Sequence, residues 1–173
     1  MKEGPMKHKK AVAFGALGLA LIGGASFRFF VWNHTPSIPV GLYLRTWEEV
    51  QIGSTVAFPA PPQAREYAID HGGNGTASKF IKPLVAGPGE EVCVFTTETG
   101  SWLIIDNRAV VSIRQKDRDG KDIPRFMDDD CRKLGPDEWL PIGHHPDSYD
   151  GRYFGPIHRA DMLGSYKPWI VGD

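Results

Sequence analysis

The chain has 173 residues, a formal net charge of −1 at pH 7 and two cysteines. That length allows one domain with a hydrophobic core of its own after any membrane segment is set aside. The near-neutral charge, without a basic run in the body of the chain, argues against nucleic acid as a partner. Two cysteines without a CxxC pair are too few for a zinc framework.

An apolar N-terminal segment follows a short lysine-rich tail. Residues 1–10 contain four lysines, and residues 11–32 contain a single charged side chain. A run of about 20 apolar residues can span a bilayer, and basic residues before it hold the N-terminus in the cytoplasm. We therefore expect a cytoplasmic tail over 1–10, a transmembrane anchor over 11–32 and an exported domain over 33–173. A cleaved signal peptide is the alternative, because Gly23-Gly24-Ala25 after a short apolar core fits that pattern too.

Either outcome exports the domain that contains Cys93 and Cys131. In an oxidising compartment the two thiols can pair, and closing that loop would stabilise the fold by about 4 kcal/mol in the chain-entropy model. Two separate buried thiols are the alternative.

From Tyr43 onward, short runs rich in Val, Ile, Phe and Thr alternate with breaks of Gly, Pro and Asp. Such runs are typical of strands, and no long helical period follows residue 33. We therefore expect a mainly β, mostly antiparallel domain behind one N-terminal transmembrane helix. The expected strands are 56–58, 79–85, 91–97, 102–105, 109–114, 139–142 and 153–154, with a brief helix at 63–69 and a solvated charged turn at 116–121.

Ser37 lies just beyond the apolar segment and is flanked by Pro36 and Pro39. Each proline fixes its own φ and pushes the residue before it toward extended geometry. This frame holds the hydroxyl in one direction, so Ser37 is a candidate nucleophile if a base lies nearby. A proline-rich turn without catalytic function is the alternative.

Lys82 lies in the expected strand 79–85, where side chains alternate between two faces. It shares its face with Phe80 and Leu84, which makes that face the drier one. A free lysine has a pKa near 10.4, so it acts as a base at neutral pH only where burial lowers that pKa. Lys82 is therefore a candidate base for Ser37, and a surface charge is the alternative.

Three sequence boxes occur in a fixed order. The first surrounds Ser37, the second is Lys82-Pro-Leu-Val-Ala-Gly-Pro-Gly-Glu90, and the third is Ser148-Tyr-Asp-Gly-Arg-Tyr-Phe-Gly-Pro-Ile157. The second is similar to the type I signal peptidase box, in which a catalytic lysine precedes a Gly-x-Pro-Gly-Asp turn. The third resembles the Ser-x-Asp-Ser-Arg-Tyr-Phe-Gly-Pro box of the same family. Together the boxes cover most of the chain outside residues 98–135, and they imply a signal-peptidase-like β domain.

The departures from the family pattern are informative. Ser37-Ile-Pro39 stands where Ser-Met-x-Pro is usual, Lys82-Pro83 replaces Lys-Arg, and Gly143-His-His-Pro146 replaces Gly-Asp-Asn-Arg. With Asn33-x-Thr-x-Ser-x-Pro-x-Gly-Leu-Tyr43, these features most resemble the conjugative-transfer branch, the TraF-type peptidases. That branch matures a plasmid-encoded pilin, and in some systems it joins the pilin ends into a ring.

The resemblance implies a role for each box. Ser37 would attack a carbonyl while neutral Lys82 takes its proton, and Thr35 would be the second oxyanion donor beside the Ser37 backbone N–H. Asp150 would be ion-paired near the lysine or would act more directly, and a simple pair with Arg152 or a turn cap is the alternative.

The same resemblance implies a protein substrate with small residues before the scissile bond, cleaved at the bacterial inner membrane by a periplasmic domain without a cofactor. A general type I signal peptidase acting on many preproteins is the alternative within the enzyme class. A non-catalytic membrane-anchored scaffold is the alternative of another class. A metal site at His144, His145 and Asp147 is a third, although adjacent histidines on a strand face opposite ways.

Overall fold

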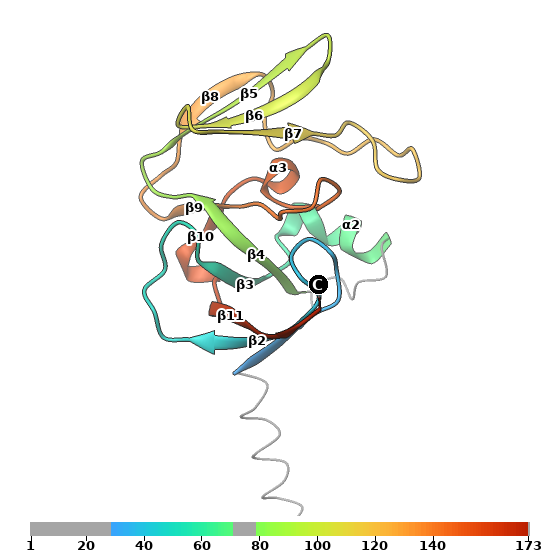
Figure 1. Cartoon of the computed structure of the whole chain (residues 1–173). Coiled ribbons are helices and arrows are strands. Elements are labelled where there is room, and N and C mark those ends of the chain that lie inside the picture. Colours follow the sequence, from blue (N-terminus) through green and yellow to red (C-terminus); the bar gives the residue numbers. More distant parts are fainter. Residues whose placement is uncertain (1–28, 71–78, 173) are drawn as a thin grey trace, which may run out of the picture.

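Two antiparallel sheets form the frame of the protein in this computed structural model, which describes residues 29–70 and 79–172 (Figure 1). Within those residues, a seven-stranded sheet has the order β1-β2-β11-β3-β4-β9-β10 and a four-stranded sheet has the order β7-β6-β5-β8. Every pairing between these strands is antiparallel, as the sequence predicted. The elements of the larger sheet are β1 Phe30–Asn33, β2 Gly41–Thr46, β3 Thr55–Pro59, β4 Lys79–Ala86, β9 Glu138–Pro141, β10 Ile157–His158 and β11 Gly164–Val171.

The remaining elements are short helices and the strands of the smaller sheet. The strands are β5 Glu91–Thr97, β6 Gly100–Ile105, β7 Ala109–Ile113 and β8 Asp130–Lys133, and the helices are η1 Pro62–Ala64, α2 Arg65–Asp70, α3 Gly151–Phe154 and η3 Arg159–Asp161. The expected helix at 63–69 therefore occurs as η1 followed by α2.

Strand β4 connects the two sheets and presents Lys82. Its first half pairs with β3, where Val56 lies opposite Lys82, and its second half pairs with β9. The chain then turns through Gly87–Glu90 into β5 of the smaller sheet, as Figure 1 shows. Because β9 pairs with β4 only at Leu84 and Ala86, residues 79–82 have no strand on that side among the described residues.

Helix α3 lies between the two sheets (Figure 1). Its Tyr153 packs in the cluster of buried side chains under β5 and β6, while Phe154 packs in the cluster around β3 and β4. The preceding residue Asp150 accepts a hydrogen bond from the Arg152 backbone N–H and caps the helix. The segment that leads to these residues is therefore held at the junction of two cores.

Helix α3 also corrects one prediction. Residues 153–154 were expected to form a strand, but they end a single helical turn that Asp150 starts. The turn stops at Gly155, whose φ of +82° favours glycine. The aromatic pair Tyr-Phe suggested β structure, whereas the local cap decides the conformation.

The end of the expected anchor also needs correction. Residues 1–28 of the tail and anchor lie outside the described part of the chain, but Phe30–Trp32 belong to β1 and pair with β2. The alternation of side chains in Phe-Val-Trp suits a strand edge, so the anchor cannot extend as a helix to residue 32. Across residues 29–70 and 79–172, no helix is long and apolar enough to span a membrane.

A disulfide joins Cys93 to Cys131, which resolves the question that the sequence left open. The two residues lie directly opposite each other on β5 and β8. The bond therefore fastens the edge strand of the smaller sheet to its neighbour.

Candidate active site

A cleft of about 860 Å³ brings together the first two sequence boxes and part of the third. Thr35, Ser37 and Lys82 all line it. Asp150 and Arg152 do not line the cleft; they are almost fully buried, with 0% and 1% of their surfaces exposed. The other walls come from β1, from α2, from the segment after β7 and from residues 145–153.

Asn33 organises the loop that carries Ser37. Its side-chain amide donates to the carbonyl oxygens of Thr35, Ile38 and Pro39, at 2.8, 3.0 and 3.1 Å. Its Oδ1 accepts from the backbone N–H of Thr35 at 3.3 Å and lies 3.2 Å from the Thr35 hydroxyl. The buried side-chain amide of Asn33 thus supplies hydrogen bonds to backbone groups on both sides of Ser37, and these bonds fix the turn.

Ser37 is buried, with 4% of its surface exposed, and its hydroxyl lies 3.0 Å from the hydroxyl of Thr35. Its carbonyl oxygen accepts from the backbone N–H of His144 at 2.7 Å and from that of His145 at 3.4 Å. The serine backbone is therefore attached on one side to the Asn33 turn and on the other to the segment before α3.

Lys82 is 5% exposed, which matches the dry face predicted for it. Burial lowers its pKa to about 8, the negative charge of Asp150 acts in the opposite direction, and the positive charge of Arg152 lowers the pKa further. A lysine in this state is substantially neutral only slightly above physiological pH, whereas an ordinary lysine is not.

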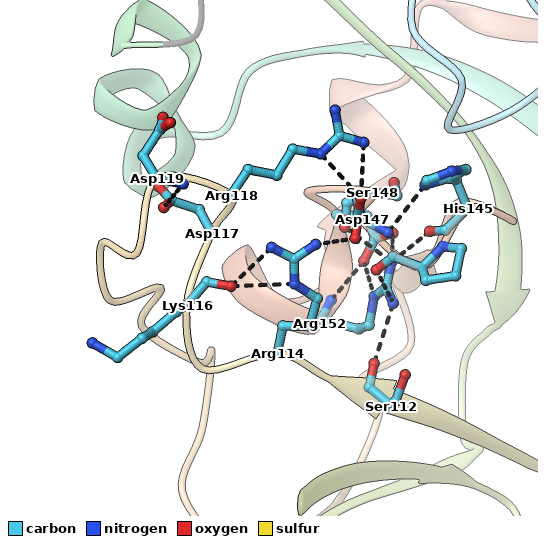
Figure 2. A network of polar contacts seen from close by, with 12 residues as sticks. Ser112, Arg114, Lys116, Asp117, Arg118, Asp119, His145, Asp147, Ser148 and Arg152 are labelled. Atoms are coloured by element: carbon cyan, nitrogen blue, oxygen red, sulfur yellow. Dashed lines mark hydrogen bonds and ion pairs between the residues drawn. The ribbon is translucent and has the colours of Figure 1, made fainter.

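Asp150 and Arg152 form a buried ion pair that holds the segment before α3. The Arg152 guanidinium donates to Asp150 Oδ1 at 2.9 Å and to Oδ2 at 2.8 Å. Asp150 Oδ2 also accepts from the backbone N–H of Gly143 at 2.9 Å. The remaining Arg152 N–H groups reach the carbonyl oxygens of Ser112, His145, Pro146 and Ser148 (Figure 2).

Comparisons with known proteins support the family resemblance that the three sequence boxes indicated. Residues 10–170 match the model of the family "Signal peptidase, peptidase S26". The chain belongs to the S26 signal peptidase family. It is 33% identical over 175 residues to "Plasmid transfer protein TraF" of Escherichia coli, covering 94% of this chain and 95% of that protein.

Two further proteins are similar to this S26 peptidase-family chain. The chain is 31% identical over 175 residues to "Conjugal transfer protein TraF" of Agrobacterium fabrum, covering 94% of this chain and 91% of that protein. The crystal structure of a signal peptidase I from Enterococcus faecalis aligns with a TM-score of 0.40 and 20% identity, over 69% of this chain and 98% of that one. The family assignment rests on the sequence relationship.

Two residues of the candidate site had no role in the sequence analysis. Asn33 was quoted only as part of a pattern, and its control of the Ser37 turn depends on contacts with backbone oxygens that spacing does not reveal. Ser148 is 5% exposed and lines the cleft, and its hydroxyl has no hydrogen-bond partner in the described structure. Gly143 makes room for it, because a Cβ there would lie 2.4 Å from the Ser148 hydroxyl oxygen.

No group of three or more His, Cys, Asp or Glu side chains is placed to hold a metal ion in the described part of this chain. Asp147, a ligand in the metal alternative, instead accepts hydrogen bonds from Arg114 and Arg118. The described residues therefore do not provide a ligand set for the metal site at His144, His145 and Asp147.

Proposed function

We propose that the protein is a membrane-anchored serine endopeptidase that uses a Ser37–Lys82 dyad to mature an exported pro-pilin in conjugative transfer. The observation that carries this proposal is a buried lysine of lowered pKa in the same cleft as a buried, framed serine. The similarity to plasmid and conjugal transfer proteins over nearly the whole chain supports the conjugative role.

The chemistry begins with neutral Lys82. Its amine accepts the hydroxyl proton of Ser37 while the serine oxygen bonds to the substrate carbonyl carbon. The resulting ammonium then gives that proton to the leaving amine, and the acyl-enzyme remains. Burial suits both steps, because it brings the pKa of Lys82 close to the working pH.

The oxyanion requires donors that point to the place where its charge develops. The Ser37 backbone N–H is one candidate, and the Thr35 hydroxyl, 3.0 Å from the Ser37 hydroxyl, is the other. We expect Thr35→Val to lower kcat by about 100-fold, since loss of one such donor typically costs that much. The measurement is kcat on a peptide substrate beside thermal unfolding, and an unchanged kcat would remove Thr35 from the site.

Asp150 acts on the site through position and charge in this proposal. Both of its oxygens already accept hydrogen bonds from Arg152, and one also accepts from Gly143. Its charge raises the pKa of Lys82 against the dominant effect of burial. Asp150 therefore keeps that pKa from falling too far, while Arg152 fixes the backbone around Ser148.

The cleft has room for an extended substrate chain. Strand β1 is the outer strand of its sheet, and residues 79–82 of β4 have no strand partner on one side among the described residues. Both edges line the cleft. A substrate strand between them could pair with backbone groups that otherwise lack strand partners, with the scissile carbonyl brought to Ser37.

An exposed apolar face supports a location at the inner membrane. Trp32 of β1 is 57% exposed, and Trp169 and Ile170 of β11 are 57% and 61% exposed. Strand β2, whose Leu44 is also exposed, lies between β1 and β11. The aromatic rings of Phe30 and Trp169 stack there at 5.3 Å. Since β1 follows the apolar N-terminal segment in sequence, we infer that this face meets the lipid interface, where aromatic residues are favoured.

The acyl-enzyme has two possible fates. Attack by water gives a linear product with a free carboxylate. Attack by the amino terminus of the same substrate gives an amide instead and closes a ring. The burial of Ser37 and Lys82 limits access of water and favours the second fate if the substrate amine can enter.

The test is co-expression of the full chain with a candidate pro-pilin, followed by mass measurement of the product. Wild type is compared with Ser37→Ala and Lys82→Ala, and Lys133→Ala on the exposed strand β8 is the matched control. We expect cleavage in wild type and control only, with a product one water lighter than the linear form if the ring closes. Cleavage by either dyad variant would refute the proposal.

The runner-up function is a general type I signal peptidase, and the family match supports it equally. A panel of preproteins with alanine before the cleavage site separates the two, since a pilin-maturing enzyme would cleave the pro-pilin alone. A non-catalytic scaffold would support conjugation undiminished with Ser37→Ala.

A further inference from the structure

Asp147 is the meeting point of two arginines from a distant part of the chain (Figure 2). Arg114 donates to its Oδ1 through Nη1, and Arg118 donates to its Oδ2 through Nε at 3.0 Å and Nη2 at 2.8 Å. We call these three residues the clamp. Both oxygens of one carboxylate are thus engaged by guanidinium groups, a geometry with more directional strength than a single lysine pair.

The arginine side of the clamp is itself fixed. Arg114 follows β7, its Nε and Nη2 donate to the carbonyl oxygen of Lys116 at 3.2 and 2.9 Å, and its backbone N–H donates to the Tyr153 hydroxyl at 3.2 Å. Further along the same segment, Lys121 forms an ion pair with Asp70 of α2 at 2.6 Å. The segment therefore crosses from α2 to Asp147. Its turn at 116–121 is mostly exposed, as its charge predicted, and it is held by ion pairs that spacing along the chain does not reveal.

The carboxylate side of the clamp belongs to the segment that holds the serine. We call residues 143–148 the serine-holding loop, because its His144 and His145 N–H groups donate to the Ser37 carbonyl oxygen. Arg152 anchors this loop from inside the protein through the carbonyl oxygens of His145, Pro146 and Ser148. Asp147 is the point at which the same loop is anchored from outside.

We propose that Asp147 is a positioning residue for peptide-bond cleavage: the clamp holds the serine-holding loop against Ser37 and so keeps the nucleophile aligned with Lys82. This inference rests on the proposed function. A misplacement of about 1 Å at a nucleophile can cost about 100-fold in rate, so a clamp outside the reacting atoms can affect kcat strongly. Because Asp147 does not form the dyad, its loss should slow the reaction without abolishing it.

The first test separates turnover from substrate binding. In the full chain, Asp147→Asn should lower kcat by about 10-fold to 100-fold while KM changes less than about threefold, since the alignment of the serine is disturbed more than the cleft. Arg118→Gln should lower kcat by a smaller factor in the same direction, and Arg118→Lys should restore part of the loss. Asp122→Asn is the matched control, because its pair with Lys116 lies in the same segment but is highly exposed.

The second test uses salt. Arg118 is 69% exposed, so its attraction to Asp147 is open to screening. The Debye length falls from about 10 Å at 0.1 M to about 3 Å at 1 M salt, so kcat of the wild type should fall over that range. The kcat of Asp147→Asn should vary less with salt, because the screened attraction is already absent.

The third test does not require activity. The backbone N–H of His144 donates to Ser37, so its hydrogen exchange reports how firmly the loop is held. Exchange at His144 should be about tenfold faster in Asp147→Asn than in wild type or Asp122→Asn. Thermal unfolding of each variant checks that the difference is local.

The outcomes distinguish this inference from the proposed function. Unchanged kcat in Asp147→Asn beside an active wild type would overturn the positioning role alone, whether or not exchange at His144 is faster. A raised KM with normal kcat would overturn it as well, because it would assign Asp147 to substrate binding. Absence of any Ser37-dependent cleavage by wild type would remove the proposed function and this inference with it.

Discussion

Lys82 is the residue on which the proposed chemistry depends. An amine that is 5% exposed loses most of its hydration, and the structure does not supply a direct ion-pair partner among the described residues. Asp150, whose negative charge raises the pKa of that amine, is itself bound by Arg152. The site therefore makes the charged form of Lys82 unfavourable, and this has consequences for both activity and stability.

The activity should rise with pH around the lowered pKa. Lys82 must be neutral to accept the serine proton, so kcat/KM should increase about tenfold per pH unit below pH 8 and level off above it. The measurement is a pH profile with a peptide substrate from pH 6 to pH 9.5. A profile that is flat across pH 8 would show that the amine does not titrate as the base.

The stability should rise over a higher pH range. The folded pKa of Lys82, about 8, lies below the ordinary lysine pKa of 10.5. Between these values the unfolded chain binds more protons than the folded chain, so unfolding becomes less favourable as pH rises. Below pH 8 the burial costs about 3 kcal/mol of folding free energy. We expect Lys82→Met to be inactive yet more stable by about 1–3 kcal/mol at pH 7, measured by denaturant unfolding. A less stable Lys82→Met would contradict this.

At the scale of elements, α3 and the segment before it combine capping with a buried charge pair. Asp150 starts the helix, binds Arg152 and holds the Gly143 backbone, all with one carboxylate that is fully buried. Removing one partner of such a pair leaves an uncompensated buried charge, which is costlier than replacing both. The element is therefore sensitive to single substitutions.

Asp150→Asn should destabilise the protein by about 3–5 kcal/mol, because Arg152 keeps its charge without its partner. The same change removes the influence that raises the pKa of Lys82, so the rise of the pH profile should move to lower pH in the variant. Denaturant unfolding and the pH profile provide the two measurements, with Asp161→Asn in η3 as the control. Complete loss of activity with undiminished stability would instead give Asp150 a direct catalytic role.

The sequence predicted most of the central strands, and it also singled out two candidate residues that the structure places in one cleft. Ser37 and Lys82 could be named as candidates because the proline frame and the strand alternation are local signals. The strand that carries Lys82 runs over Lys79–Ala86, as expected to within one residue. Strand β11 was missed, since Pro168 interrupts its pattern and its pairing with β2 is long-range in sequence. The pairing of Arg118 with Asp147 likewise depends on packing that spacing along the chain does not contain.

For the whole molecule, the exposed apolar face and the cleft must be considered together. The face lies on β1, β2 and β11, while the cleft opens between β1 and β4, so β1 contributes to both. A substrate that leaves the membrane beside this face would reach Ser37 after few residues. The proposed orientation thus places the scissile bond close to the lipid surface.

Bound lipid should quench the tryptophans of this face. In vesicles containing brominated lipid, the full chain should lose emission from Trp32 and Trp169, since aromatic residues of an interface lie at the depth of the headgroups and upper acyl chains. The variant Trp32→Phe/Trp169→Phe should show clearly less quenching, whereas Trp102→Phe in β6 of the smaller sheet should not. Equal quenching in both variants would place the face away from the membrane.

The Cys93–Cys131 disulfide bears on when the cleft of this protein is completed. The segment with Arg114 and Arg118 leaves the smaller sheet at β7 and re-enters it at β8, the strand that the bond fastens to β5. A newly made chain in a reducing cytoplasm would lack this bond. If the domain is exported as proposed, the cleft wall formed by the segment between β7 and β8 would be fixed by the disulfide only after oxidation outside the cytoplasm. The enzyme would then reach its final structure in the compartment where its substrate arrives.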